Sequence, residues 1–273
     1  MRLLSILSLL GACSFTAPAA MTASNDASTD GALAIDADEA SGVVPCMTPD
    51  ASGLVLCLEL EDGVDDGMLS DSSSGRRHAI TSGLVTATRT VPAMSTAAHV
   101  GSQSVTRVAE DLALDLDGGY TFGVWVQPDT LPAEGSVYGI LDHEQQYAML
   151  VGYSAGSLEN RCVHTGVARY EFTTVLPVGT WSFLACTWNG TQLCAYRWTS
   201  PTSNEHFCHT PVVAPSLAGT QGLAIGHLSE DGTAHSRFDG ALDSLQIYNR
   251  GLTEDQLCTL IGLGAGCMPC SGC

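Results

Sequence analysis

One stretch near the end of the chain, residues 238–257, restricts the possible fold more than any other. Its first half has the apolar content of a buried strand and ends at Asn249-Arg250-Gly251. Because side chains alternate along a strand, one face is predicted to hold Leu242, Ser244, Gln246 and Tyr248, and the other Asp243, Leu245 and Ile247. A short helix is predicted next, since Thr253 and Gln256 have capping-box spacing and Gly262 is a suitable stop.

The rest of the chain predicts short strands separated by turns. Tyr120–Asp129 alternates most clearly and contains Pro128 near its end, and Asn189-Gly190 between two apolar runs indicates a β-hairpin. Other strands are expected at 53–60, around 100–108, and at 137–142, 147–151, 161–165 and 222–227. This pattern favours an all-β fold, either a β-sandwich or a jelly roll, with a short C-terminal helix.

The charge of the chain argues against one class of partner. The 273 residues carry a formal net charge of −19, and all ten basic residues are arginine. Nucleic-acid binding depends on neutralising phosphates, so we expect no nucleic-acid partner. An acidic surface allows cation binding, but it is equally the ordinary surface of a soluble protein.

The N-terminus has the features of an export signal. A short apolar run at 3–10 precedes Leu10-Gly11-Ala12-Cys13, which is similar to a bacterial lipobox, so Cys13 is the predicted lipidation site and the protein is predicted to be anchored to a bacterial envelope membrane. The alternative is an ordinary signal peptide cleaved near Ala20, which gives a secreted protein. We divide the chain into an anchor (1–13), a disordered tether (14–45), a folded domain (46–262) and a cysteine-rich tail (263–273).

Ten cysteines remain if Cys13 is lipidated, an even number that can form five disulfides in an oxidising compartment. They are Cys46, Cys57, Cys162, Cys186, Cys194, Cys208, Cys258, Cys267, Cys270 and Cys273. Two local pairs suggest themselves, Cys186 with Cys194 across the hairpin turn and Cys194 with Cys208 across residues 200–206.

A set of motifs in fixed order resembles a known family. They are Asp71-Ser72-Ser73 with Gly75 and His78, Phe122–Asp129, Gly179–Gly190, Leu223–Gly226 and Phe238–Thr253. Together they are similar to the LamG-like jelly-roll family of the concanavalin A-like lectin/glucanase superfamily, here in a bacterial lipoprotein. The resemblance implies two antiparallel sheets packed face to face, with the first strand near the last.

Enzyme motifs are incomplete. Glucanases of this superfamily carry Glu-x-Asp-x-x-Glu on one strand, and the nearest run, Glu110–Asp115, has the wrong order. Gly152–Gly156 matches a nucleophile elbow but is followed by a predicted strand instead of a helix. His143-Glu144 lacks the second histidine of a zinc protease, and His206–His209 is expected to be surface.

Two binding sites are predicted. The resemblance brings Asp62, Asp71 and Asp243 together, which implies a structural Ca²⁺, although Ser244 stands where the family has a second acid. The alternative is that Asp71 forms an Asx-turn and Asp243 faces solvent or a backbone amide. Trp198 with Arg197 is the candidate ligand platform, unless Trp198 packs beneath the nearby disulfide loop.

These observations predict a non-enzymatic, extracytoplasmic recognition module that binds a glycan or a protein and is displayed as a surface lipoprotein. A structural envelope lipoprotein without a specific ligand is the alternative, and a hydrolase is the least supported because its carboxylate motif is missing.

Overall fold

The computed structural model describes residues 51–61, 67–90, 95–130, 132–143, 146–164, 168–171, 176–200, 203–210, 221–230 and 233–261. All of them belong to one compact unit that spans Val43–Cys273. The predicted anchor with Cys13, the tether and the tail lie outside the described residues, as does Asp62.

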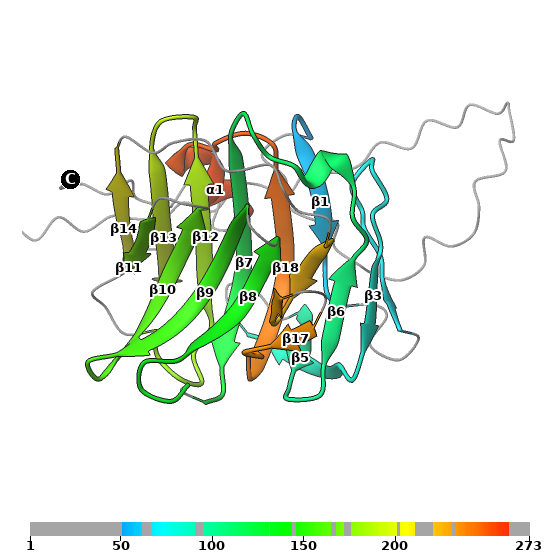
Figure 1. Cartoon of the computed structure of the whole chain (residues 1–273), viewed down its shortest axis with the longest axis vertical. Coiled ribbons are helices and arrows are strands. Elements are labelled where there is room, and N and C mark those ends of the chain that lie inside the picture. The colour runs from blue at the N-terminus through cyan, green and yellow to red at the C-terminus, as the bar shows by residue number, and fades with distance from the viewer. Residues whose placement is uncertain are drawn as a thin grey trace, which may run out of the picture. The chain divides into compact units, whose positions relative to one another are not determined.

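The described residues form two large antiparallel sheets that lie face to face (Figure 1). The first, the β7 sheet, has the order β14 (Ser203–His209), β13 (Leu193–Ser200), β12 (Ser182–Trp188), β7 (Tyr120–Pro128), β18 (Gly240–Tyr248), β5 (Ser95–Val100) and β4 (Val85–Arg89), and β1 (Leu54–Leu58) also pairs with β18. The second, the β9 sheet, has the order β11 (Ala168–Glu171), β10 (Ser157–His164), β9 (Tyr147–Ser154), β8 (Val137–His143), β15 (Leu223–Ile225), β6 (Val105–Val108), β3 (Ala79–Ser82) and β2 (Met68–Leu69). Three small elements are the pair β16 (Leu228–Glu230) and β17 (Thr233–His235) and the 3₁₀ helix η1 (Leu112–Leu114). The predicted all-β sandwich is confirmed.

Two hydrophobic clusters stabilise this arrangement. The larger lies between the sheets and includes Leu56, Phe122 and Met149. The smaller covers the outer face of the β7 sheet, where the helix α1 (Glu254–Leu260) packs Leu257 against side chains such as Trp125. Burial of this many apolar side chains on both faces of the β7 sheet is the main source of stability.

β18 lies at the centre of the β7 sheet, and the first strand lies beside it, as the resemblance implies. It pairs with β7 on one side and with β5 and β1 on the other. The predicted alternation fails at one point, since a bulge between Asp243 and Gln246, with Ser244 at φ 51°, places Leu242 and Leu245 in the same inner cluster. The predicted helix is confirmed, with both hydrogen bonds of its capping box formed between Thr253 and Gln256.

One segment differs from its predicted form, and a second has the form that the sequence predicts. The weak strand expected near 100–108 is two strands, because β5 ends at Val100 and β6 begins at Val105 in the other sheet. The elbow-like Gly152–Gly156 lies at the β9–β10 hairpin, where Ser154 pairs with Ser157, so it leads into a strand as expected.

The disulfides confirm one predicted pair and correct the other. Cys194 bonds to Cys208 on the neighbouring strand, with Cα atoms 4.1 Å apart. Cys186 instead bonds to Cys162 of the opposite sheet, because its side chain faces the inner cluster while that of Cys194 faces the outer one. Cys57 and Cys258 are also disulfide-bonded. Disulfides of this kind indicate an oxidising compartment.

Membrane insertion through a helix has no support in the described part of the chain, where no helix is long and apolar enough to cross a bilayer.

Candidate functional site

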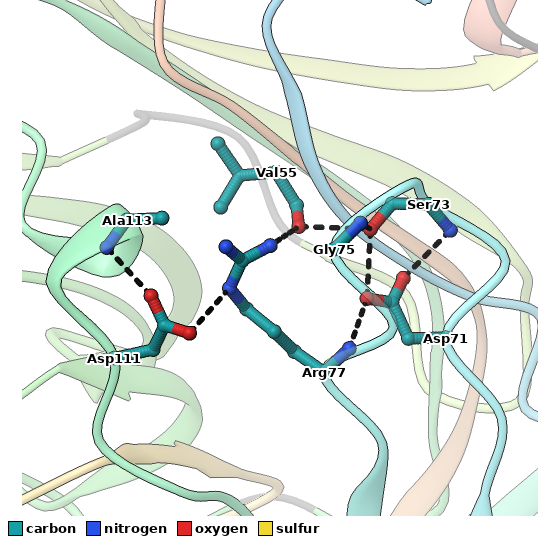
Figure 2. Close-up of polar contacts among 7 residues, drawn as sticks. All are labelled: Val55, Asp71, Ser73, Gly75, Arg77, Asp111 and Ala113. Atoms are coloured by element: carbon teal, nitrogen blue, oxygen red, sulfur yellow. Dashed lines mark hydrogen bonds and ion pairs between the residues drawn. The ribbon is translucent and has the colours of Figure 1, made fainter.

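Asp71, one of the predicted metal ligands, is buried and bonded to protein donors (Figure 2). One carboxylate oxygen accepts hydrogen bonds from the backbone amides of Cys57 at 2.9 Å and Ser73 at 2.8 Å. The other accepts from the Ser73 hydroxyl at 2.7 Å and the Arg77 amide at 2.5 Å. Four donors satisfy the carboxylate, so the Asx-turn alternative holds for Asp71. The hydrogen bond from Cys57 also ties the Asp71 loop to β1.

Arg77 extends this network to η1 (Figure 2). Its guanidinium donates to the carbonyl of Val55 at 3.0 Å and pairs with Asp111 at 3.1 Å. Asp111 is the N-cap of η1 and accepts from the Ala113 amide, and this hydrogen bond, with Arg77, lowers the pKa of Asp111. The network therefore fixes where η1 begins.

Asp243 has a different set of partners. Its carboxylate pairs with Arg89 at 2.5 Å and accepts from the hydroxyls of Ser95 at 2.8 Å and Ser244 at 3.1 Å. Burial raises the pKa of Asp243, while Arg89 and the two serines oppose the shift. Asp71 and Asp243 share no donor, so the described contacts give no support to their joint role as Ca²⁺ ligands.

The predicted ligand platform does not present an open ring. Trp198 is 1% exposed and packs in the outer cluster against Phe183 and Tyr196. Arg197 is also buried and pairs with Glu205 on β14 at 3.0 Å. The packed alternative for Trp198 therefore holds, and a ligand surface must be sought elsewhere.

A hollow of about 390 Å³ lies at one end of the sandwich, where β5 and β7 end and β18 begins. It is lined by Ser102, Tyr138, Arg237, Phe238 and Asp239. The rings of Tyr138 and Phe238 meet edge to face with centroids 6.4 Å apart. Phe238 is buried in the inner cluster, so Tyr138 is the partly exposed ring of the pair. One aromatic ring beside a cation and a carboxylate can contact an apolar surface and hydrogen-bond hydroxyl groups in a single ligand.

Neighbouring contacts fix the shape of this hollow. Asp239 accepts a hydrogen bond from Thr130 at 2.8 Å, and Arg237 donates to the Ser104 carbonyl at 3.2 Å. Gly240 admits the close approach of the next strand, since a Cβ there would lie 2.2 Å from the Gln127 carbonyl oxygen. The charged side chains are thus held in place before any ligand arrives.

A second cluster lies at the opposite end of β8. Glu110, Asp115 and His143 place their ligand atoms within 4.8 Å of one another. Burial, Asp115 and Asp111 raise the pKa of Glu110, and burial lowers the pKa of His143, against Asp115 and Gln146. Among the described residues, these three have the donor types and convergence that a metal ion needs.

Comparison with family profiles gives a match over residues 100–258, to a laminin-G-type profile described as the concanavalin A-like lectin/glucanases superfamily. The chain belongs to this superfamily. The match covers β6 to α1 and therefore most of both sheets. Comparison with curated proteins finds no match.

Solved structures confirm the concanavalin A-like fold. Domain 4 of AbnA, an extracellular GH43 arabinanase from Geobacillus stearothermophilus in complex with arabinotriose, is 18% identical with a TM-score of 0.57, covering 78% of this chain and 100% of that one. The binding domain of botulinum neurotoxin DC in complex with SialylT is 8% identical with a TM-score of 0.53, covering 78% and 52%. The same binding domain with rat synaptotagmin II is 9% identical with a TM-score of 0.54, covering 77% and 51%.

Sequence reasoning missed the hollow of this concanavalin A-like domain. Tyr138 and Arg237 belong to no motif, and Asp239 lies in the motif Phe238–Thr253 without a predicted binding role. The three residues meet because β8 forms a parallel bridge between Gly139 and Arg237. In the sequence, Glu110–Asp115 has the wrong order for a glucanase motif and His143-Glu144 lacks a second histidine, and nothing local links the two segments. Only the sheet order reveals that the two segments are neighbours.

Proposed function

We propose that this chain is a non-enzymatic recognition module of an exported protein and that it binds a glycan in the hollow beside Tyr138. The supporting observation is the composition of the lining, which combines the partly exposed ring of Tyr138 with Arg237 and Asp239. Its volume of about 390 Å³ falls in the range of small-ligand sites. Structural neighbours solved with arabinotriose and with SialylT make a glycan a reasonable first ligand to test.

The absence of a paired acid supports a binding role. Glycoside hydrolysis uses two carboxylates on either side of the scissile bond. Among the described residues that line the hollow, Asp239 is the single carboxylate, and Thr130 already donates to it. The hollow therefore has groups to hold a sugar and lacks the acid–base pair that would cleave one.

A glycan array probed with the full chain, with and without CaCl₂, tests this proposal. We expect a defined set of glycans to bind, and Tyr138→Ala to weaken binding at least about tenfold, since stacking of one aromatic ring contributes on the order of 1.4 kcal/mol. Phe207→Ala is the matched control, because Phe207 is an exposed aromatic on β14, away from the hollow. An array without hits in either condition, or equal binding by Tyr138→Ala, would contradict glycan binding in the hollow.

A protein ligand is the second candidate, because one structural neighbour was solved with synaptotagmin II. Phe207 is 50% exposed on an edge strand, a position where a partner could pack. In a binding assay with a protein ligand, loss of binding by Phe207→Ala with normal binding by Tyr138→Ala would favour this candidate.

The display of the module as a lipoprotein is also a proposal. Disulfides at Cys162–Cys186 and Cys194–Cys208 support an exported protein, and the lipobox before Cys13 supports an acyl anchor. Fatty-acid labelling should be lost in Cys13→Ala and kept in the wild type. Labelling that persists in the variant would exclude Cys13 as the acylated residue.

A further inference from the structure

The Glu110, Asp115 and His143 cluster is assembled by the sheet order of the β9 sheet. β15 lies between β6 and β8, and its Leu223 pairs with both Val108 and His143. Glu110 follows β6 by two residues, so it reaches the end of β8 across one strand. Gly222 permits this closeness, because a Cβ there would lie 2.1 Å from the Val108 carbonyl oxygen.

The surroundings of the His143 side chain point to a missing ligand. This side chain is 0% exposed, and neither ring nitrogen makes a hydrogen bond of regular geometry, although Gln146 lies near enough to act on its pKa. Nε2 lies 3.5 Å from Glu110 Oε2, and the Tyr147 ring stacks on the imidazole at 5.2 Å, which holds its direction. Buried polar groups almost always have a partner, so two orphaned nitrogens next to two carboxylates require an explanation.

Gln146 is a second buried polar side chain beside this cluster, and one of its side-chain atoms lacks a hydrogen-bond partner. It is fully buried, and its Nε2 donates to Asp115, which orients that carboxylate. Its Oε1 has no hydrogen-bond partner. A metal-binding carboxylate is commonly held by such a neighbour, and an open amide oxygen adds one more lone pair to the site.

We propose that Glu110, Asp115 and His143 bind one divalent transition-metal ion of the Zn²⁺ class. A neutral imidazole nitrogen and carboxylate oxygens are the donors that Zn²⁺ takes, whereas Ca²⁺ and Mg²⁺ take oxygen ligands alone. Three protein ligands leave a fourth position for water or for the Gln146 oxygen. The site is independent of the hollow, since His143 ends β8 and Tyr138 lies near its start.

The network around Arg77 supports this assignment by defining which acids are available. Asp111, between Glu110 and η1, is occupied by Arg77 and by the Ala113 amide. It therefore serves to anchor the segment, while Glu110 and Asp115 on either side remain free to converge on His143. An ion there would tie the β6–β7 connection to the end of β8.

The test is a calorimetric titration of the full chain with ZnCl₂ and, in parallel, CaCl₂, after chelator treatment and with disulfides intact. We expect one Zn²⁺ per chain, a higher melting temperature with Zn²⁺, and no comparable effect of Ca²⁺. His143→Gln and Glu110→Gln should each weaken Zn²⁺ binding at least about tenfold. If His143→Gln does not fold, Glu110→Gln decides, because Glu110 is a partly exposed side chain.

His227→Gln is the matched control. His227 is also fully buried and has one nitrogen without a partner, but its charged neighbours are Arg107, Arg237 and His235. This variant should bind Zn²⁺ like the wild type.

Co²⁺ then identifies the ligands by visible absorption, which should disappear in His143→Gln. The proposal is overturned if no ion binds, if Ca²⁺ is preferred, or if affinity is unchanged in both His143→Gln and Glu110→Gln. A strong sulfur-to-cobalt charge-transfer band would also overturn it, because it would assign the ion to thiolates such as Cys267, Cys270 and Cys273.

Discussion

Asp71 and the Glu110 cluster lie at the two ends of one polar network and differ in what satisfies them. Asp71 accepts four hydrogen bonds from the protein, three of them from backbone amides. Glu110 and Asp115 instead face each other and His143, whose ring nitrogens have no hydrogen-bond partner. Arg77 contacts Asp71 through its backbone amide and Asp111, the residue after Glu110, through its guanidinium (Figure 2).

This difference shows how an acidic residue in a loop can be assigned a role. A carboxylate whose lone pairs are filled by amide donors is part of the fold, and removing its charge leaves those donors unpaired. A carboxylate such as Glu110, whose pKa is raised by burial and by neighbouring acids and which lies beside an unpaired imidazole, is costly to the fold and gains from a cation. Asp243 is also satisfied by the protein, although its donors are the guanidinium of Arg89 and the hydroxyls of Ser95 and Ser244 instead of backbone amides.

The largest expected effect is that of Asp71→Asn. The amide that replaces one carboxylate oxygen cannot accept from the donors that now point to it, so the free energy of unfolding should fall by roughly 3 kcal/mol. Urea unfolding at neutral pH measures this, with Ser74→Ala as a control at an exposed neighbouring position. The loss should be the same with and without chelator. A loss that vanishes in chelator would mean that Asp71 holds an ion after all.

His227 gives an intermediate effect that separates burial from metal binding. Burial lowers the pKa of His227 to about 4 from 6.5, and the charges of Arg107, Arg237 and His235 act in the same direction. As pH falls below about 6.5 the unfolded chain takes up this proton, while the folded chain does so only near pH 4. The stability that His227 contributes is therefore present above pH 6.5 and lost as pH falls toward 4.

The comparison with His227→Gln measures this loss. The difference in unfolding free energy between wild type and variant should shrink as pH is lowered from 7 to 4. Urea unfolding in the presence of chelator measures this difference at each pH. A difference that stays constant across this range would show that the pKa of His227 is not lowered in the folded chain. The charged neighbours of His227 and His143 would then not explain how the two histidines differ.

The fold was largely predictable because its signals are local. Thr253 and Gln256 have capping-box spacing, Asn189-Gly190 joins β12 to β13, and the motif order identifies the superfamily. The bulge at Ser244 was not predictable, since its positive φ is imposed by pairing of β18 with two neighbours. Cys186 was misassigned for a related reason: proximity along a hairpin says nothing about which face a side chain occupies.

The sites were predictable only in part, because they depend on contacts distant in sequence. Asp71 looked like a ligand by resemblance, yet its role is set by the amides of Cys57 and Arg77, which no motif reveals. Trp198 looked exposed by its place near an insert, but α1 and the outer cluster cover it. A binding role for His143 can be inferred only from the fold, in which β15 brings Glu110 beside it.

The smallest expected effect is that of Glu110→Gln in chelator, and it is the sharpest contrast with Asp71→Asn. Burial and the charges of Asp115 and Asp111 raise the pKa of Glu110, so losing its charge removes a repulsion and breaks no hydrogen bond to an amide. The unfolding free energy should stay within about 0.5 kcal/mol of the wild type. Added Zn²⁺ should then stabilise the wild type and leave the variant nearly unchanged, since only the form that binds the ion gains from it. A large loss in chelator would instead place Glu110 with Asp71, as a carboxylate that the fold itself requires.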